Sequence, residues 1–117
     1  MTALFKKGTF TSAAGILLPW KIECDALTDE DWETLAVIIA SKCMFGSVFG
    51  VPTGGEKLAK ALEKYITPGL SIRLVVDDVF TTGKTLSGYI KLHDIIWVVF
   101  ARNPTPKHIK AIWTYTG

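Results

Sequence analysis

The stretch "RLVVDDVFTTGKTL", residues 73–86, runs from apolar, β-branched residues into two adjacent aspartates, Asp77 and Asp78. Residues 72–80 have the length and composition of a buried strand, which places both carboxylates at its carboxyl end. Adjacent carboxylates repel each other, and the local sequence offers no basic partner. Sugar hydroxyls, a Mg²⁺ ion held through water, or both would compensate them. The alternative is that Asp78 only caps the turn and Asp77 faces solvent.

The turn after this strand is suited to bind an anion. Gly83 permits a positive φ, and the N–H groups at the start of a helix predicted over residues 85–93 have no helical partner. The residues expected to hold a phosphate are Thr81, Thr82, Gly83, Lys84 and Thr85. A plain capped turn explains Gly-Lys-Thr alone equally well. A P-loop is disfavoured, because the glycine that it needs five positions before Gly83 is replaced by Asp78.

A second turn of the same kind, "GVPTGG", occupies residues 50–55, after a strand predicted over 44–51. Pro52 fixes one φ, while Gly54 and Gly55 open the backbone before a helix predicted over 55–65. Alone, this turn reads as an ordinary strand-to-helix loop. Together with the aspartates and the first turn, it predicts a site for a ligand with two phosphate groups and a sugar between them.

Strands alternate with helices along the chain. The sequence predicts strands over 19–24, 44–51, 72–80, 95–102 and 109–115, and helices over 28–43, 55–65 and 85–93. The first helix begins with a capping box, since Thr28 is followed by Asp31 three residues later. Apolar strands between amphipathic helices predict an α/β fold with one mostly parallel sheet, flanked by helices on both faces. In such folds ligands bind beyond the carboxyl ends of the strands, where both turns fall.

Composition narrows the function classes. The 117 residues are 49% hydrophobic and 21% charged, as in a single globular domain. A net charge of +2 gives no support for nucleic-acid binding, and no apolar run is long enough to span a membrane. Cys24 and Cys43 lack metal-ligand spacing and are read as reduced thiols, with a cytoplasmic location as the default.

The motif "LVVDDVFTTGKTL" resembles the phosphoribosyl pyrophosphate (PRPP) motif of the type I phosphoribosyltransferases, in which a hydrophobic run and two acids precede Thr-x-Gly-x-Thr. "GVPTGG" resembles the pyrophosphate loop of this family, especially of orotate phosphoribosyltransferases. More loosely, "GTFTSAAGILLPWKIECD", residues 8–25, resembles their N-terminal hood. The resemblance thus implies a hood over residues 1–26 and an α/β core over 27–117.

The resemblance also implies roles. Asp77 and Asp78 would be catalytic, holding the ribose hydroxyls with Mg²⁺ as cofactor, and the turn at residues 81–85 would bind the 5-phosphate. The pyrophosphate group would be bound by Pro52, Thr53, Gly54 and Gly55. The base would be contacted by Phe10, Trp20, Lys21 and Arg102, although a solvated strand-end Arg102 is an equal alternative. The substrates would be PRPP and a nitrogenous base or nucleotide.

The residue at position 81 bears on which nitrogenous base the protein would use. The 6-oxopurine branch of the family carries an aspartate there as a general base, and Thr81 cannot serve in that way. The resemblance therefore favours the orotate-like branch.

The sequence also departs from this family. Family members carry a long catalytic loop before the PRPP strand, and here "ITPGLS", residues 66–71, is the whole connection. Two functions follow: an orotate-like phosphoribosyltransferase, or a relative with reduced activity that binds PRPP or a nucleotide as a sensor. A homodimer is expected, because a small protein with exposed sheet edges readily associates and a second subunit could supply a lid.

Overall fold

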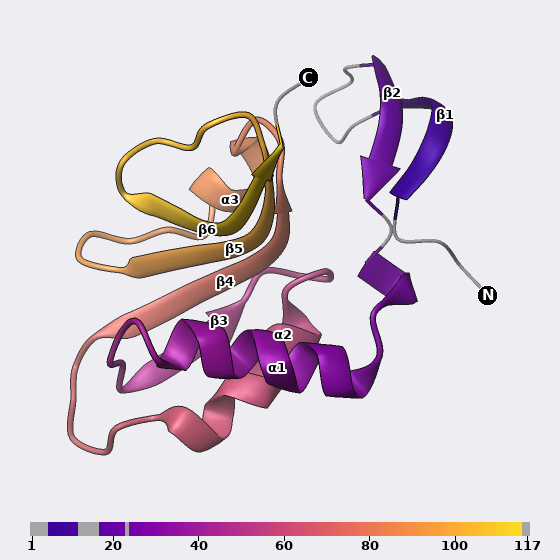
Figure 1. Ribbon diagram of the computed structural model, residues 1–117. Coiled ribbons are helices and arrows are strands. Elements are labelled where there is room, and N and C mark those ends of the chain that lie inside the picture. The colour runs from indigo at the N-terminus through magenta and orange to yellow at the C-terminus, as the bar shows by residue number, and fades with distance from the viewer. Residues whose placement is uncertain (1–4, 12–16, 23, 116–117) are drawn as a thin grey trace.

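The computed structural model describes residues 5–11, 17–22 and 24–115, with the backbone alone described in the two N-terminal strands and at Asp25. Figure 1 shows a β-hairpin followed by an α/β unit. The elements in chain order are β1 (Phe5–Thr11), β2 (Leu17–Ile22), η1 (Cys24–Ala26), α1 (Asp29–Ala40), β3 (Ser47–Gly50), α2 (Glu56–Leu62), η2 (Glu63–Tyr65), β4 (Arg73–Phe80), α3 (Lys84–Ser87), β5 (Ile95–Arg102) and β6 (Ile109–Tyr115).

The main sheet has four strands in the order β3-β4-β5-β6, and each neighbouring pair is parallel. The predicted α/β fold with a parallel sheet is therefore confirmed. All four carboxyl ends lie at one edge of this sheet, as in the right-hand part of Figure 1. The connections that leave β3 and β4 consequently start side by side.

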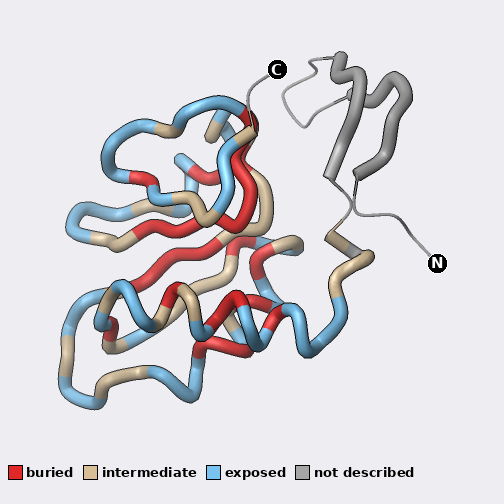
Figure 2. Tube along the Cα trace, in the orientation of Figure 1, coloured by how far each residue is buried: buried red, intermediate tan, exposed pale blue. Residues whose placement is uncertain are grey.

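Different helices pack on the two faces of the sheet. Leu74 and Val76 of β4 point to the face packed by α1 and α2, whereas Val75 between them points to the other, in keeping with the two-residue period of a strand. On that second face Leu86 of α3 packs with Val75 and Phe80. Figure 2 shows the buried stretches running along the central strands between these covers.

Helix α1 begins as predicted. The Asp31 N–H donates to Thr28 Oγ1 (3.1 Å), and the Thr28 N–H donates to Asp31 Oδ2 (2.9 Å), which completes the capping box. Trp32, Leu35 and Ile39 lie on its buried face, as the periodicity indicates. The helix ends at Ala40 rather than near residue 43, and Cys43 is half-buried beyond it.

Two further predicted elements were wrong in extent. The helix expected over 85–93 is the four-residue α3, because the chain turns at Gly88 and Tyr89. The strand expected over 44–51 is only Ser47–Gly50. The expectation of helices on both faces therefore holds on the α1–α2 face, while the other face has one helical turn.

The N-terminal segment contains more structure than predicted. The sequence predicts one strand in residues 1–26, over 19–24, yet β1 and β2 form an antiparallel hairpin with a register shift between Lys7 and Phe10. The hairpin is a separate two-stranded sheet and lies beside the carboxyl edge of the main sheet (Figure 1). Its division from the core at residue 26 stays a prediction.

No helix in the described part of the chain is long and apolar enough to cross a membrane.

Candidate functional site

The two turns that the sequence singled out meet at the carboxyl edge of the sheet. Gly50 of β3 pairs with Val76 of β4, and the Val51 N–H donates to the Val76 carbonyl (2.9 Å) beyond the last paired residues. The turn at residues 51–55 therefore lies against the backbone that carries Asp77 and Asp78.

Glycine makes this approach possible. A Cβ at Gly54 would lie 2.3 Å from Asp78 Oδ2, and one at Gly55 would lie 2.4 Å from the Val76 carbonyl oxygen. Real side chains do not tolerate such distances, so glycine at these positions lets the turn lie against the end of β4 and the Asp78 carboxylate. The Pro52–Thr53 peptide bond in this turn is cis.

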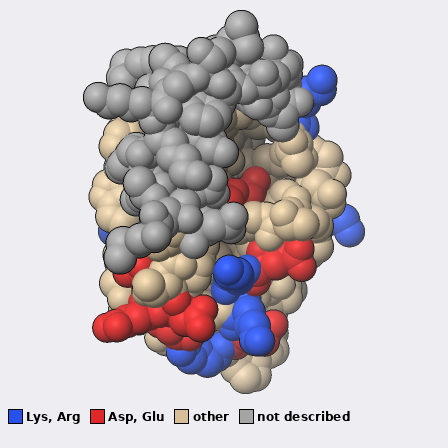
Figure 3. All heavy atoms as spheres, turned by 90° about the vertical axis from the view of Figure 1, so that its right-hand side faces the viewer, with Lys and Arg blue, Asp and Glu red and all other residues tan. Residues whose placement is uncertain are grey.

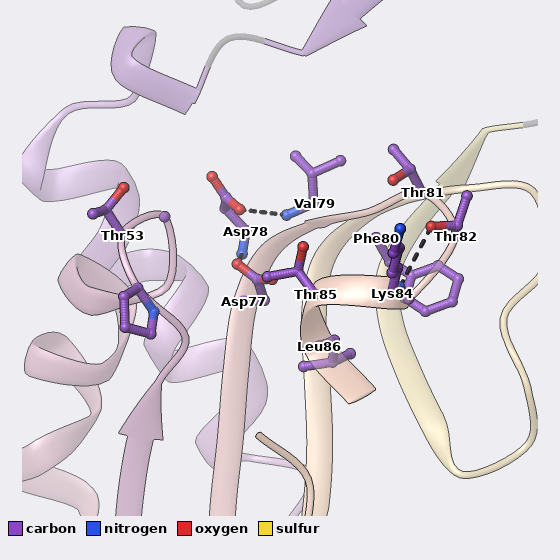
Figure 4. A pocket seen from close by; sticks show the side chains of 13 residues that line it. Thr53, Asp77, Asp78, Val79, Phe80, Thr81, Thr82, Lys84, Thr85 and Leu86 are labelled. Carbon is purple, nitrogen blue, oxygen red and sulfur yellow. Dashed lines mark hydrogen bonds between the residues drawn. The ribbon is translucent and has the colours of Figure 1, made fainter. Parts of the chain in front are cut away.

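A cavity of about 260 Å³ opens between the two turns. Figure 4 shows the acidic side chains of Asp77 and Asp78 between Thr53 on one side and the turn at residues 81–85 on the other. The lining residues are Pro52, Thr53, Gly54, Asp77, Asp78, Val79, Phe80, Thr81, Thr82, Gly83, Lys84, Thr85 and Leu86. The structure thus brings the predicted phosphate turns and the predicted ribose acids into one cavity; Gly55, predicted with them, adjoins it without lining it.

Asp77 and Asp78 interact directly with each other. The Asp78 N–H donates to Asp77 Oδ1 (2.8 Å), and the Val79 N–H donates to Asp78 Oδ1 (2.7 Å). The pKa of Asp77 is raised to about 8, most strongly by burial and then by a hydrogen bond and charge repulsion from the neighbouring Asp78 carboxyl, while the hydrogen bond from the Asp78 N–H acts to lower it. A cation or hydroxyl donor that favours the charged form would lower this pKa.

The turn at residues 81–85 has the backbone that the sequence predicts. Gly83 adopts a left-handed conformation (φ 77°), and a Cβ there would lie 2.6 Å from the Phe80 ring. Leu86 is buried below and anchors the turn to the sheet, while Thr82 and Lys84 are exposed. The Lys84 N–H donates only a long bond of 3.4 Å to Thr82 Oγ1, so it remains available to an anion.

The donor set at the acids fits a Mg²⁺ ion that keeps water and ligand oxygens. No group of three or more His, Cys, Asp or Glu side chains that could hold a metal occurs among the described residues. Asp77 and Asp78 alone supply carboxylates here, and Mg²⁺ is commonly bound by one or two carboxylates together with water and ligand phosphates. The site suits an ion that arrives with its ligand better than a permanent metal centre.

Of the four predicted base contacts, Arg102 alone has a described side chain, and it lies away from this cavity. Arg102 ends β5 with only 8% of its surface exposed, so the alternative of a solvated arginine was wrong, and burial lowers the pKa of its guanidinium. It is not among the residues that line the cavity. Phe10 belongs to β1 and Trp20 and Lys21 to β2, and their side chains lie outside the described part of the structure.

Three apolar residues of the cavity wall were not predicted. Val79, Phe80 and Leu86 line it beside the acids and the phosphate turn. The signal in the sequence was their position inside the motif, where two apolar residues separate the acids from the threonines. Phe80 and Leu86 also belong to the hydrophobic core.

Several solved structures share this architecture. Orotate phosphoribosyltransferase from Aeropyrum pernix is similar over 95% of this chain and 88% of its own, with a TM-score of 0.72 and 18% identity. UMP synthase from Leishmania donovani is similar over 95% of this chain and 33% of its own, with a TM-score of 0.75 and 16% identity. Orotate phosphoribosyltransferase from Mycobacterium tuberculosis, in complex with inorganic phosphate, has a TM-score of 0.62 and 13% identity over 92% of this chain and 86% of its own.

No protein-family model matches the sequence, and no curated protein matches it either. The similarity to solved structures is therefore one of fold. The chain has the fold of the type I phosphoribosyltransferases, and the solved structures that it resembles include orotate phosphoribosyltransferases and a UMP synthase. The resemblance predicted from the two motifs is confirmed at this level.

Proposed function

We propose that this protein is a phosphoribosyltransferase of the orotate-like type, which transfers ribose 5-phosphate between PRPP and a nitrogenous base with Mg²⁺ present. The observation that carries the proposal is the single cavity lined by Thr53, Gly54, the two aspartates and the turn at residues 81–85. Two anion-suited turns stand on either side of a pair of acids, and PRPP has two phosphate groups on either side of a ribose.

Each part of the cavity has a role in this proposal. The turn at residues 81–85 binds the 5-phosphate through N–H groups and threonine hydroxyls. Asp77 and Asp78 accept hydrogen bonds from the ribose hydroxyls and orient the sugar. The Pro52–Gly55 turn receives the pyrophosphate group, since its glycines let the phosphate oxygens approach the backbone. The base nitrogen then forms a bond to C1 while the C1–O bond breaks, and the electron pair of the C1–O bond leaves with pyrophosphate.

Mg²⁺ would be held by Asp77 and Asp78, and it would supply charge neutralisation for the pyrophosphate. The raised pKa of Asp77 supports this role, because a buried acid without a compensating charge gains most from a cation or a donor. The orotate-like type is supported by the solved structures of similar fold and by Thr81, which offers no general base.

The test is pyrophosphate release from PRPP with Mg²⁺ and one base at a time, from orotate, uracil and the common purines. We expect release with orotate or a related pyrimidine, and a loss of at least about tenfold in Asp78→Asn, which removes one charge from the ribose site. The absence of release with every base would rule out the transferase.

A binding protein without turnover is the second candidate, and one observation favours it. The connection between η2 and β4 is short and lies at the amino-terminal end of β4, opposite the cavity (Figure 1), so it cannot cover a bound ligand. An uncovered site exposes the reacting centre to water. Calorimetry that finds tight PRPP binding in a protein that releases no pyrophosphate would select this candidate, and it would act as a sensor or regulator.

A further inference from the structure

A second cavity adjoins the proposed PRPP site. It measures about 210 Å³ and is lined by Cys24, Trp32, Thr53, Gly54, Lys57 and Asp78. Thr53, Gly54 and Asp78 also line the first cavity, so the two spaces lie on the two sides of one glycine-containing turn. A ligand group bound at this turn is within reach of the residues of the second cavity.

Trp32, which lines this second cavity, carries an unused hydrogen-bond donor. The side chain comes from α1 and is only 4% exposed, and its Nε1 is buried with no hydrogen-bond partner. It is the one buried side-chain nitrogen or oxygen in that condition among the described residues. Buried polar groups almost always have partners, so an orphaned N–H beside a cavity indicates a bound acceptor that the protein itself does not supply.

Lys57 adds a cation to the same second cavity. It lies in α2 two residues after Gly55, lines the second cavity, and also borders the groove between α1 and α2. In the described part of the chain it makes no ion pair, whereas Lys64, two turns later, pairs with Glu33. Figure 3 shows basic and acidic side chains on the surface over the beginnings of α1 and α2, below a hollow with acidic atoms.

Charge balance shows why such donors are needed. The first cavity contains two acids, and its single lysine is Lys84, in the turn proposed for the 5-phosphate. The end formed by Thr53 and Gly54 contributes backbone but no cation, and the Asp78 carboxylate next to it repels a phosphate. A pyrophosphate group carries several negative charges and requires positive charge at this end.

We propose that Lys57 and the indole N–H of Trp32 bind the outer phosphate of the pyrophosphate group, in the cavity beyond the Thr53–Gly54 turn. This inference rests on the proposed function, and it gives a role to an exposed lysine of α2 and to a core tryptophan of α1. Lys57 offsets the charge of Asp78, while Trp32 orients one phosphate oxygen. The competing occupant of this cavity is water.

The test compares ligands that contain and lack the pyrophosphate group. Calorimetric titrations of the wild type, Lys57→Met and Trp32→Phe would use inorganic pyrophosphate, PRPP and ribose 5-phosphate at one Mg²⁺ concentration. We expect Lys57→Met to weaken pyrophosphate and PRPP binding about tenfold and Trp32→Phe by a smaller factor, the effect of losing hydrogen bonds to a charged group. Ribose 5-phosphate binding should not change.

Two control variants match these changes. Lys60→Met removes the same charge one turn further along α2, where the side chain borders only the outer groove, and Trp113→Phe removes an indole N–H on β6. Neither should alter pyrophosphate binding. Because Trp32→Phe disturbs a packed ring, the wild-type indole ¹H–¹⁵N resonance of Trp32 provides a second measurement, and pyrophosphate should displace it more than those of the other three tryptophans.

The outcomes separate the two proposals. Equal effects of Lys57→Met and Lys60→Met, or an unmoved Trp32 resonance at saturating pyrophosphate, mean that water alone fills the cavity and overturn the inference. A wild type that does not bind pyrophosphate also overturns it. If pyrophosphate binds through Lys57 but neither PRPP nor ribose 5-phosphate binds, the subsite stands and the proposed function fails.

Discussion

Asp77 is the residue whose chemistry depends most on the fold. Its pKa of about 8 is far above the ordinary value of about 4 for an aspartate. Between these two values the folded protein retains a proton that the unfolded chain releases. Raising the pH through this window therefore costs stability, by up to about 1.4 kcal/mol for each pH unit.

Asp77→Asn removes this dependence. We expect the free energy of unfolding of the wild type to fall as the pH rises from 4 to 8 and to level off above 8. The variant lacks this contribution, so its stability relative to the wild type should increase at high pH. Urea unfolding at pH 5.5 and 8.5 measures both. An identical pH slope in the two proteins would show that Asp77 is ionised in the folded state at pH 5.5. Mg²⁺ with PRPP should flatten the wild-type slope.

Gly54 provides a second test at a single residue. A Cβ at this position would lie 2.3 Å from Asp78 Oδ2 and 2.5 Å from Asp78 Cγ, so Gly54→Ala must displace the carboxylate. We expect a loss of PRPP affinity of at least about tenfold, because a displacement of about 1 Å at a binding group costs this much or more. Gly88→Ala is the control, since its Cβ would meet nothing closer than the Thr85 carbonyl at 3.5 Å. Equal affinities in both variants would contradict the proposed site.

At the scale of elements, α1 positions Trp32 and carries the buried face of the core, and its start depends on the Thr28–Asp31 box. Thr28→Ala should lower the free energy of unfolding by about 1 kcal/mol, the usual effect of losing an N-cap. Thr34→Ala is the matched control, because Thr34 donates only to the Glu30 carbonyl within the helix and alanine is the better helix former. Chemical denaturation measures both, and equal losses would mean that the box does not stabilise the helix start.

The elements also show what could be predicted from the sequence. Helix α1 and strands β4 and β5 follow from local signals: a capping box, a 3.6-residue period and continuous β-branched runs. The length of α3 does not, because "TLSGYIKLH" has helix-forming residues on both sides of Gly88 and the chain turns there to reach β5. Of the hairpin, β2 was predicted and β1 was not, because β1 mixes lysine, glycine and threonine without a clear alternation.

The two motifs of the candidate site could be predicted from the sequence. The residues around them, and the second cavity beside the site, could not. Residues 50–55 and 77–85 carry their own turn chemistry, and parallel strands bring them together. Arg102, in contrast, has an apolar strand before it and a loop after it, and its sequence gives no sign that it is buried. Trp32 and Lys57 lie on helices whose periodicity explains them fully, so only their common cavity suggests a further role.

For the whole molecule, the sheet order leaves β3 and β6 as edge strands, and β6 exposes 44% of Trp113, which stacks on Phe100 with ring centroids 5.3 Å apart. Exposed edges and aromatic surface favour association. We expect a homodimer in solution, with twice the chain mass of 12.8 kDa by light scattering at micromolar concentrations. A single-chain mass that does not change with concentration would contradict this and would also exclude a lid supplied by a second subunit.

Ligand binding should stabilise the whole domain in proportion to how many of its parts the ligand joins. The 5-phosphate turn follows β4 and the pyrophosphate turn follows β3, so PRPP bridges two neighbouring strands that are otherwise joined by a short ladder of four paired residues. At one hundred times its dissociation constant PRPP adds about 2.7 kcal/mol, which raises the melting temperature of a domain of this size by roughly 10 °C. At the same concentration, ribose 5-phosphate and pyrophosphate each contact one end of the cavity and should raise it less. Differential scanning fluorimetry measures all three, with Gly54→Ala as the control that should lose the PRPP effect. If PRPP stabilised the protein no more than ribose 5-phosphate does, the pyrophosphate turn would not take part in binding, and the two turns would not form one site.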